Sequence, residues 1–173
     1  MTESERDDLF RQWLGEHQGI LVKIARARAS TANDQEDLFQ EMLLQLWLSI
    51  PRFRGDSRAS TWIYRVALNT SMAWDRSHRR YRDRVRTLAA PSEVVDPIHD
   101  AGRHDDAAEV DRLYGAIRTL PKVDASIVLL HLDGLSYREM ADVLGISLSN
   151  VGVRLNRAKR RLFEALEEDG HGT

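Results

Sequence analysis

A chain of 173 residues, 42% hydrophobic and 30% charged, has enough apolar residues for the core of one ordinary domain or two small ones. The absence of cysteine excludes disulfides, thiolate zinc sites and cysteine nucleophiles. The net charge is −2, the acidic N-terminus lacks a signal-peptide pattern and no apolar run could span a bilayer, so we expect a cytoplasmic globular protein without membrane insertion.

Apolar residues recur at helical spacing along most of the chain, which predicts an all-α fold. Residues 5–29 should form one long helix or two short ones. A cap-rich segment at 30–34 precedes a helix that continues to about Ile50, where Pro51 ends it. The apolar surface of this second helix is wider than a core-facing helix needs, which calls for a further explanation.

A loop at 53–57, with Gly55 as its pivot, leads into a third helix that ends near Arg86. Residues 51–86 hold ten arginines against three aspartates, and aromatic residues are interleaved with them. Basic side chains follow phosphates, and exposed aromatic rings can stack on unpaired bases. The same residues are also compatible with core packing and a solvated helix end, so composition alone leaves nucleic-acid binding open here.

Residues 87–107 combine an acidic excess with two prolines and a glycine, and lack an apolar period. They indicate a flexible linker between two small helical domains. The domains should span 1–88 and 108–170, with 89–107 as the linker. Beyond it, the sequence predicts helices over 108–120 and 122–132.

The segment 135–162 reads LSYREMADVLGISLSNVGVRLNRAKRRL and predicts a helix-turn-helix. Ser136 and Glu139 have the spacing of a capping box, Gly145 suits the end of the first helix, and Ser147 caps the second. The stretch 152–163 carries five basic residues and no acidic one. An amphipathic hairpin with a solvated basic face is the alternative. The helix cap, the glycine turn, the single apolar side of the second helix and its basic charge all agree, and this agreement favours DNA binding.

Both basic segments match one family in the same order. DQEDLFQEMLLQLW (34–47), FRGDSRASTWIYRVALN (53–69) and LPKVDASIVLLHLDGLSYREMADVLGISLSNVGVRLNRAKRRL (120–162) resemble a bacterial RNA polymerase sigma factor of the sigma-70 family. The resemblance is to the extracytoplasmic-function (ECF, group IV) class, which keeps only the domains called regions 2 and 4. It implies a dissociable subunit that directs promoter-specific initiation, with no catalysis and no cofactor or metal.

The resemblance also implies partners. The 34–47 helix would dock on the clamp helices of the largest polymerase subunit, which would explain its wide apolar surface, and region 4 would meet the polymerase flap. An anti-sigma protein would hold the factor inactive. The residues that the resemblance assigns to polymerase docking are Asp34, Asp37, Leu38, Gln40, Glu41, Leu44 and Trp47.

The resemblance also assigns one promoter element to each of the two basic segments. Region 2 would hold a flipped base of the −10 element in a pocket formed by Phe53, the 54–57 loop, Tyr64, Arg65 and Asn69. Region 4 would place the 148–165 helix in the major groove of the −35 element. The −10 set is Phe53, Arg54, Arg58, Tyr64, Arg65, Asn69, Arg76, Arg79 and Arg80, and the −35 set is Ser149, Asn150, Val153, Arg154, Arg157, Lys159 and Arg161.

Two positions depart from the family pattern: Gly152-Val153 in the recognition helix and Leu68 before Asn69. Gly152 would either let the helix approach the DNA backbone closely or simply weaken the helix. Both departures affect which promoter sequence we expect the protein to recognise more than whether it acts as a sigma factor.

Two other classes of function compete. A stand-alone helix-turn-helix regulator would dimerise, yet no dimerisation helix is evident. Asp34, Glu36, Asp37 and Glu41 suggest a metal site of an enzyme, but their spacing also suits helix capping and partner contacts. Because acidic segments offset the basic ones, the free protein should bind DNA weakly.

Overall fold

The computed structural model describes residues 2–88 and 105–170, and their side chains up to His78 and from Ala108 to Glu167. No strand occurs in this part of the chain, and the all-α prediction is confirmed. Residues 89–104, most of the predicted linker, lie outside the described residues. The elements are α1 (Glu3–Arg28), α2 (Ala32–Ser49), the short 3₁₀ helix η1 (Ile50–Arg52), α3 (Ala59–Leu88), α4 (Asp105–Thr119), α5 (Lys122–Leu132), α6 (Tyr137–Leu144) and α7 (Leu148–Gly170).

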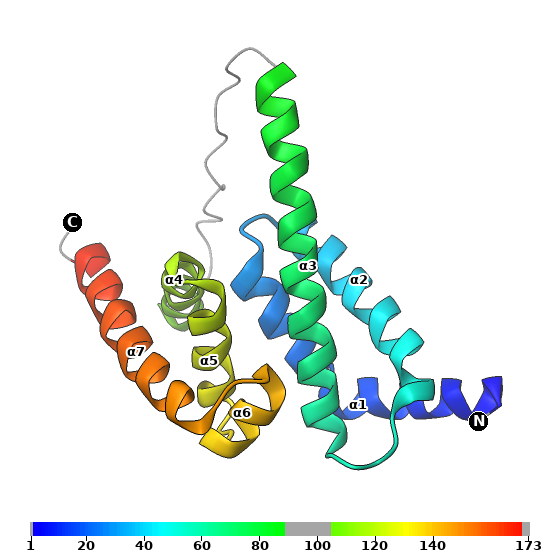
Figure 1. Ribbon diagram of the computed structural model, residues 1–173. Coiled ribbons are helices and arrows are strands. Elements are labelled where there is room, and N and C mark those ends of the chain that lie inside the picture. The colour runs from blue at the N-terminus through cyan, green and yellow to red at the C-terminus, as the bar shows by residue number, and fades with distance from the viewer. Residues whose placement is uncertain (1, 89–104, 171–173) are drawn as a thin grey trace.

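Helices α1, α2 and α3 pack on one another as the first bundle (Figure 1). The 5–29 region is one continuous helix rather than two, and it opens with a capping box between Thr2 and Glu5. Thr31 caps α2 by accepting a hydrogen bond from the backbone N–H of Asp34. The inner faces of the three helices form the core, which includes Trp13, Leu21, Ile24, Leu38, Met42, Leu46, Ile63, Ala67 and Leu68.

Helices α4 to α7 form the second bundle, and its helix-turn-helix has the predicted local signals. Ser136 accepts from the backbone N–H of Glu139, whose carboxylate accepts in turn from the backbone of Ser136. Gly145 has φ +66°, a left-handed conformation that costs glycine little. Ser147 accepts from the backbone N–H of Asn150 at the start of α7. The local prediction of this motif is confirmed.

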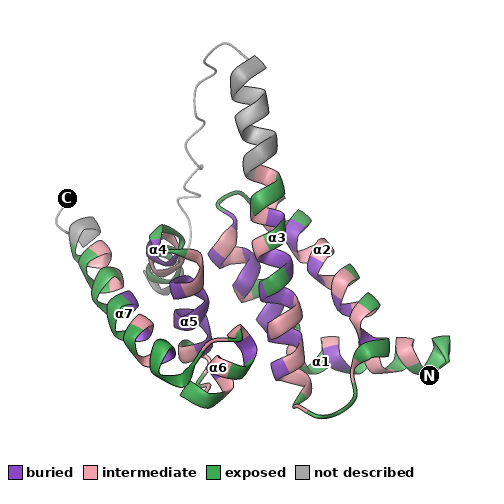
Figure 2. Cartoon of the chain, in the orientation of Figure 1, coloured by how far each residue is buried: buried purple, intermediate pink, exposed green. Residues whose placement is uncertain are grey.

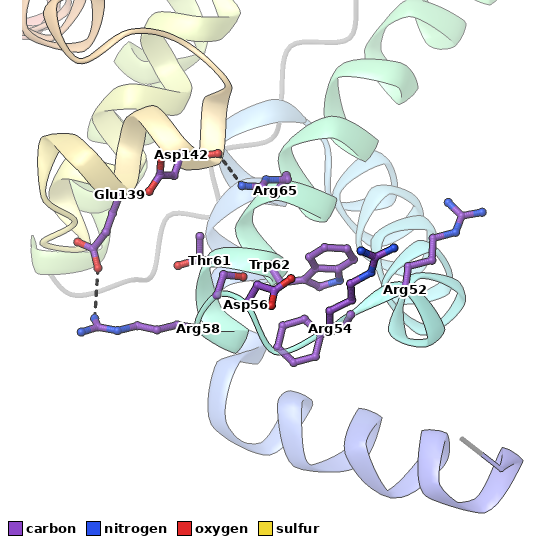
Figure 3. Close-up of a pocket in the computed structure, with 11 residues that line it drawn as sticks. Arg52, Arg54, Asp56, Arg58, Thr61, Trp62, Arg65, Glu139 and Asp142 are labelled. Carbon is purple, nitrogen blue, oxygen red and sulfur yellow. Dashed lines mark hydrogen bonds and ion pairs between the residues drawn. The ribbon is translucent and has the colours of Figure 1, made fainter.

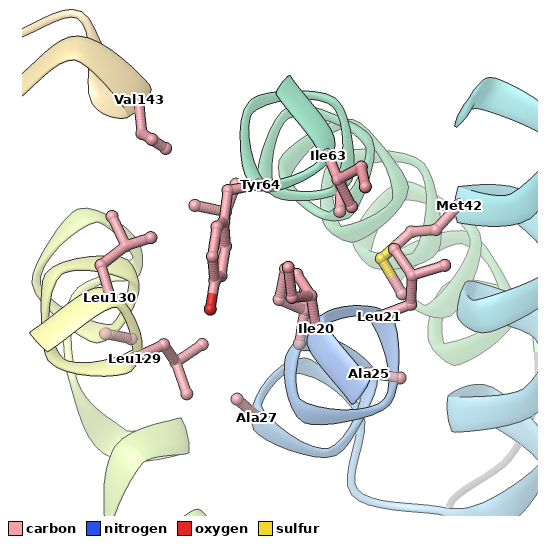
Figure 4. Close-up of a cluster of buried hydrophobic side chains, with 14 of the residues drawn as sticks. Ile20, Leu21, Ala25, Ala27, Met42, Ile63, Tyr64, Leu129, Leu130 and Val143 are labelled. Carbon is pink, nitrogen blue, oxygen red and sulfur yellow. The ribbon is translucent and has the colours of Figure 1, made fainter. Parts of the chain in front are cut away.

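The two bundles pack against each other, a relation that the sequence left open. Buried apolar side chains of α1 and α3 meet those of α5 and α6 in one cluster, drawn in Figure 4. In Figure 2 the buried residues line the inner faces of both bundles, while most of α7 is exposed. Polar contacts border the cluster: Arg26 pairs with Asp111 at 2.7 Å, and Arg28 donates to the carbonyl of Lys122 at 3.0 Å. The described residues therefore share a single core.

Candidate functional site

The apolar surface of α2 divides into an inner and an outer face. Leu38, Met42 and Leu46, spaced four residues apart, are at most 1% exposed and belong to the core. Leu44 and Leu48 lie on the opposite side and are 51% and 48% exposed. The inclusion of Leu38 among the docking residues is therefore wrong, because a side chain in the core offers a partner no surface.

Most of the other predicted docking residues surround the exposed leucines. Asp37, Gln40 and Glu41 lie three, four or seven positions from Leu44, which places them on the outer face of α2. Asp37 and Gln40 are exposed, whereas Glu41 and Asp34, at the start of the helix, are half-buried. The result is an apolar patch with a polar and acidic rim.

Trp47 is held by the first helix. Its indole N–H donates to the Asp7 carboxylate at 3.1 Å, and the guanidinium of Arg6 lies 3.3 Å from the centre of its ring. The side chain is half-buried under these contacts. Of the predicted docking residues, Trp47 therefore has part of its surface already covered by α1.

Several predicted −10 residues line an open cavity of about 730 Å³ at the start of α3 (Figure 3). Phe53 supplies an aromatic wall, and Arg54, Arg58 and Arg65 supply positive charge. Trp62 also lines the cavity, although it was absent from the predicted set. Its ring lies edge-on to Phe53 at 5.6 Å between centroids, and its indole N–H donates to Ser49 at 3.0 Å. Interleaving with arginines was the sequence signal that could have identified it.

Helix α6 of the second bundle closes one side of this cavity. Arg58 pairs with the Glu139 carboxylate at 3.2 Å, and Arg65 donates to the backbone carbonyl of Asp142 at 2.7 Å (Figure 3). Hydrogen bonds from the backbone N–H and the hydroxyl of Ser136 lower the pKa of Glu139 below its ordinary value, which favours the carboxylate. Two predicted DNA-binding arginines thus face groups of the other bundle.

Tyr64 does not line this cavity and instead borders a second, smaller one of about 360 Å³ together with Lys23 and Asp133. It is 4% exposed and packs near Leu129, Leu130 and Val143 of the second bundle (Figure 4). Its hydroxyl donates to the Asp133 carboxylate, which also pairs with Lys23. Burial, reinforced by Asp133, raises the pKa of Tyr64, so the phenol stays protonated. The prediction that Tyr64 faces the pocket is wrong for this arrangement of the bundles.

The remaining −10 residues lie further along α3. Asn69 and Arg76 are exposed, and neither lines the cavity. The side chains of Arg79 and Arg80 lie outside the described residues. The structure thus brings together Phe53, Arg54, Arg58 and Arg65 but not the whole predicted set.

Helix α7 exposes most of the predicted −35 residues: Ser149, Asn150, Val153, Arg157, Lys159 and Arg161. Arg154 is the exception, because it is half-buried and pairs with Asp124 of α5 at 2.8 Å. Its Nε also donates to the side-chain oxygen of Asn150 at 3.2 Å. The guanidinium of Arg154 therefore lies toward α5 and is already engaged.

Gly152 faces the first helix of the motif. A Cβ atom at this position would lie 3.6 Å from the ring of Tyr137 in α6, an ordinary van der Waals distance. An alanine would therefore fit at this position, so the packing of α7 on α6 does not require a glycine.

We expect a Gly152→Ala variant to be more stable than the wild type by about 1 kcal/mol, because alanine favours a helix interior and its methyl group fits beside Tyr137. A thermal melt followed by circular dichroism should show a midpoint roughly 2–4 °C higher. Gly152→Lys is the comparison, since lysine also favours a helix over glycine but places a longer, charged side chain beside Tyr137. An unchanged or lower midpoint for the alanine variant would contradict this account.

No three His, Asp or Glu side chains gather to hold a metal ion in the portions of the chain that the structure describes. Within the same portions, no helix combines the length and apolar character needed to cross a membrane.

Comparisons with known proteins agree with the two-part layout. A family model described as sigma-70 region 2 matches residues 13–88, and one described as sigma-70, region 4 matches residues 111–162. The chain is 30% identical to the ECF RNA polymerase sigma factor SigM of Mycobacterium tuberculosis, over 92% of this chain and 76% of that protein. It is 29% identical to the ECF RNA polymerase sigma-E factor of Haemophilus influenzae, over 81% and 78% respectively. The fold resembles that of the sigma factor RpoE of Bartonella quintana, solved in complex with the anti-sigma factor NepR, with a TM-score of 0.67, 22% identity and coverage of 91% of this chain and 96% of that one.

Proposed function

This chain belongs to the ECF class of bacterial RNA polymerase sigma factors and directs promoter-specific transcription, and from that premise we propose how its surfaces divide the task. The outer face of α2 binds core RNA polymerase, the cavity at the start of α3 binds the −10 element, and α7 binds the −35 element. The function is that of a dissociable specificity subunit without catalysis of its own, acting in the cytoplasm.

The observation that carries the docking proposal is the division of α2 into two faces. The inner leucines complete the core, so the fold does not need Leu44 and Leu48 to be apolar. Exposed leucines with a polar and acidic rim are typical of a surface that a protein partner covers. We place the clamp helices of the largest polymerase subunit there.

The cavity suits an unpaired base because it combines aromatic walls with nearby positive charge. Phe53 and Trp62 offer ring surfaces, and Arg54 and Arg58 lie within reach of the phosphates that flank a flipped base. On α7, Asn150 and Val153 lie near the N-terminus, where a recognition helix reads base edges, while Arg157 and Lys159 contact phosphates.

The packing of the two bundles implies an order of events. While α6 contacts α3, Arg58 and Arg65 are engaged and the ring of Tyr64 is enclosed. Use of these groups on promoter DNA requires α6 to move away. We propose that core polymerase binds the separated bundles better than the packed ones and so shifts the population toward the DNA-binding form.

Reconstituted transcription tests this function. Core polymerase with the protein, incubated with genomic DNA fragments of the source bacterium, should yield transcripts with defined 5′ ends that core polymerase alone does not produce. Failure to bind core polymerase, or transcripts without promoter selectivity, would overturn the proposal. A stand-alone helix-turn-helix regulator is not favoured, since it leaves the match over residues 13–88 unexplained. A gel shift without polymerase distinguishes it, because such a regulator would bind its site alone.

We also propose that an anti-sigma protein regulates this chain. The sigma factor RpoE of Bartonella quintana was solved in complex with the anti-sigma factor NepR. An inhibitor of this kind would cover the outer face of α2 or the DNA-binding surfaces. A pull-down from cells with the tagged chain should recover such a protein, and recovery of polymerase alone would argue against it.

A further inference from the structure

Asp124 is a buried carboxylate that belongs to none of the three binding surfaces proposed above. It lies in the first turn of α5 and is 2% exposed. A carboxylate in such a position is costly unless cations pair with it. Its partners both come from the recognition helix: Arg154 at 2.8 Å and Arg161 at 3.5 Å.

The contact extends to a residue that is placed to read bases. Arg154 lies two turns before Arg161 on the same side of α7, and its Nε donates to the side-chain oxygen of Asn150 one turn earlier. Asp124 thus fixes the guanidinium of Arg154, and that guanidinium occupies the acceptor of the Asn150 amide. With its oxygen engaged in this way, Asn150 offers DNA its NH₂ group as a donor, which suits an acceptor on a base edge.

The same contact removes positive charge from the DNA-binding surface. With Asp124 between them, Arg154 and Arg161 contribute less to nonspecific attraction of phosphates than their number suggests. Sequence selectivity is the ratio of specific to nonspecific affinity. The orientation of Asn150 raises the specific affinity, and the restraint of the two arginines lowers the nonspecific affinity, so both effects raise this ratio.

We propose that Asp124 is a positioning residue for recognition of the −35 element, acting through Arg154 on Asn150. The proposal rests on the proposed function of α7. It assigns a role in promoter selectivity to a residue of α5 that lies outside the recognition helix and is too buried to contact DNA itself.

The test is a selection from promoter DNA randomised in the upstream element, performed with core polymerase and the full-length chain. The wild type should return a defined motif. Asp124→Asn, Arg154→Gln and Asn150→Ala should each relax the preference at the same base positions, by roughly tenfold or more in relative affinity. For Asp124→Asn, the slope of log affinity against log salt should also become steeper by about one to two units, because two arginines are released to contact phosphates.

Arg160→Gln is the matched control. Arg160 also lies on α7 and is exposed, but it pairs with Glu164 at 3.9 Å rather than with Asp124. It should change affinity for all sequences alike and leave the motif intact. A purely structural role of Asp124 would lower the melting midpoint without changing the base preference of the folded protein.

The outcomes separate the two proposals. If the wild type returns no upstream motif, the function proposed for α7 fails. If the wild type and Asn150→Ala differ but Asp124→Asn and Arg154→Gln return the wild-type motif, the positioning role fails and the function stands. If Asp124→Asn does not fold, Arg154→Gln still decides the question, because Arg161 still pairs with Asp124 at 3.5 Å and the glutamine amide can donate to that carboxylate.

Discussion

A Leu44→Asp variant is expected to lose about a hundredfold of its affinity for core RNA polymerase while its own fold stays intact. Leu44 is 51% exposed at the middle of the outer face of α2, and a carboxylate there would have to be desolvated against an apolar partner surface. The free energy of unfolding should change by no more than about 1 kcal/mol, since the side chain supports no core contact that would be lost.

Co-purification and fluorescence anisotropy with labelled protein measure this affinity. Val22→Asp is the matched control: Val22 is 43% exposed on α1, so the same charge enters a helix surface of similar exposure outside the proposed docking face. We expect the control to bind core polymerase like the wild type. Equal losses for both variants, or no loss for Leu44→Asp, would show that the outer face of α2 is not the docking surface.

An Asp133→Ala variant is expected to separate the two bundles and raise the affinity of the free protein for single-stranded DNA by about tenfold. Asp133 accepts the hydrogen bond of the buried Tyr64 hydroxyl and pairs with Lys23. Its loss leaves a buried hydroxyl without this acceptor, at a cost of about 1–3 kcal/mol to the packed state. A change of that size shifts the packed-to-separated ratio by about tenfold or more, and Arg58, Tyr64 and Arg65 then become available to DNA.

Because the chain lacks cysteine, two introduced cysteines give specific dye attachment. Glu36 on α2 and Asn156 on α7 are exposed and belong to different bundles, so energy transfer between them reports separation. Asp142→Ala is the control of equal charge change, since Asp142 contacts Arg65 through its backbone carbonyl, which the substitution retains. Transfer that stays at the wild-type value in Asp133→Ala would show that Asp133 does not hold the bundles together.

The helix-turn-helix was predictable because its signals are local. The capping box joins residues three positions apart, and the left-handed glycine and the cap of α7 act within one turn. A short window of sequence therefore contains the donors and acceptors that begin and end each helix. Pro51 likewise indicated the end of α2, which finishes at Ser49 and is followed by the 3₁₀ helix η1 from Ile50.

The second helix shows where periodicity stops being informative. Leu38 and Leu44 are both apolar members of one wide surface, and both were predicted to dock. Only the packing of α1 and α3 on α2 decides that Leu38 is enclosed and Leu44 is exposed. A helix with apolar residues on two faces has two self-consistent orientations, and its neighbours select one of them.

The sequence by itself determined the helices, the order of the two bundles, the basic recognition helix and the family to which they point, because each depends on residues close together in the chain or on ordered motifs. Only the tertiary structure decided which partners the side chains of Tyr64 and Arg154 contact. Tyr64 meets Asp133 across 69 residues and Arg154 meets Asp124 across 30, so no local pattern records either pair. A buried hydroxyl or carboxylate takes whichever partner the fold brings to it, and here those partners engage two side chains that the sequence had assigned to DNA.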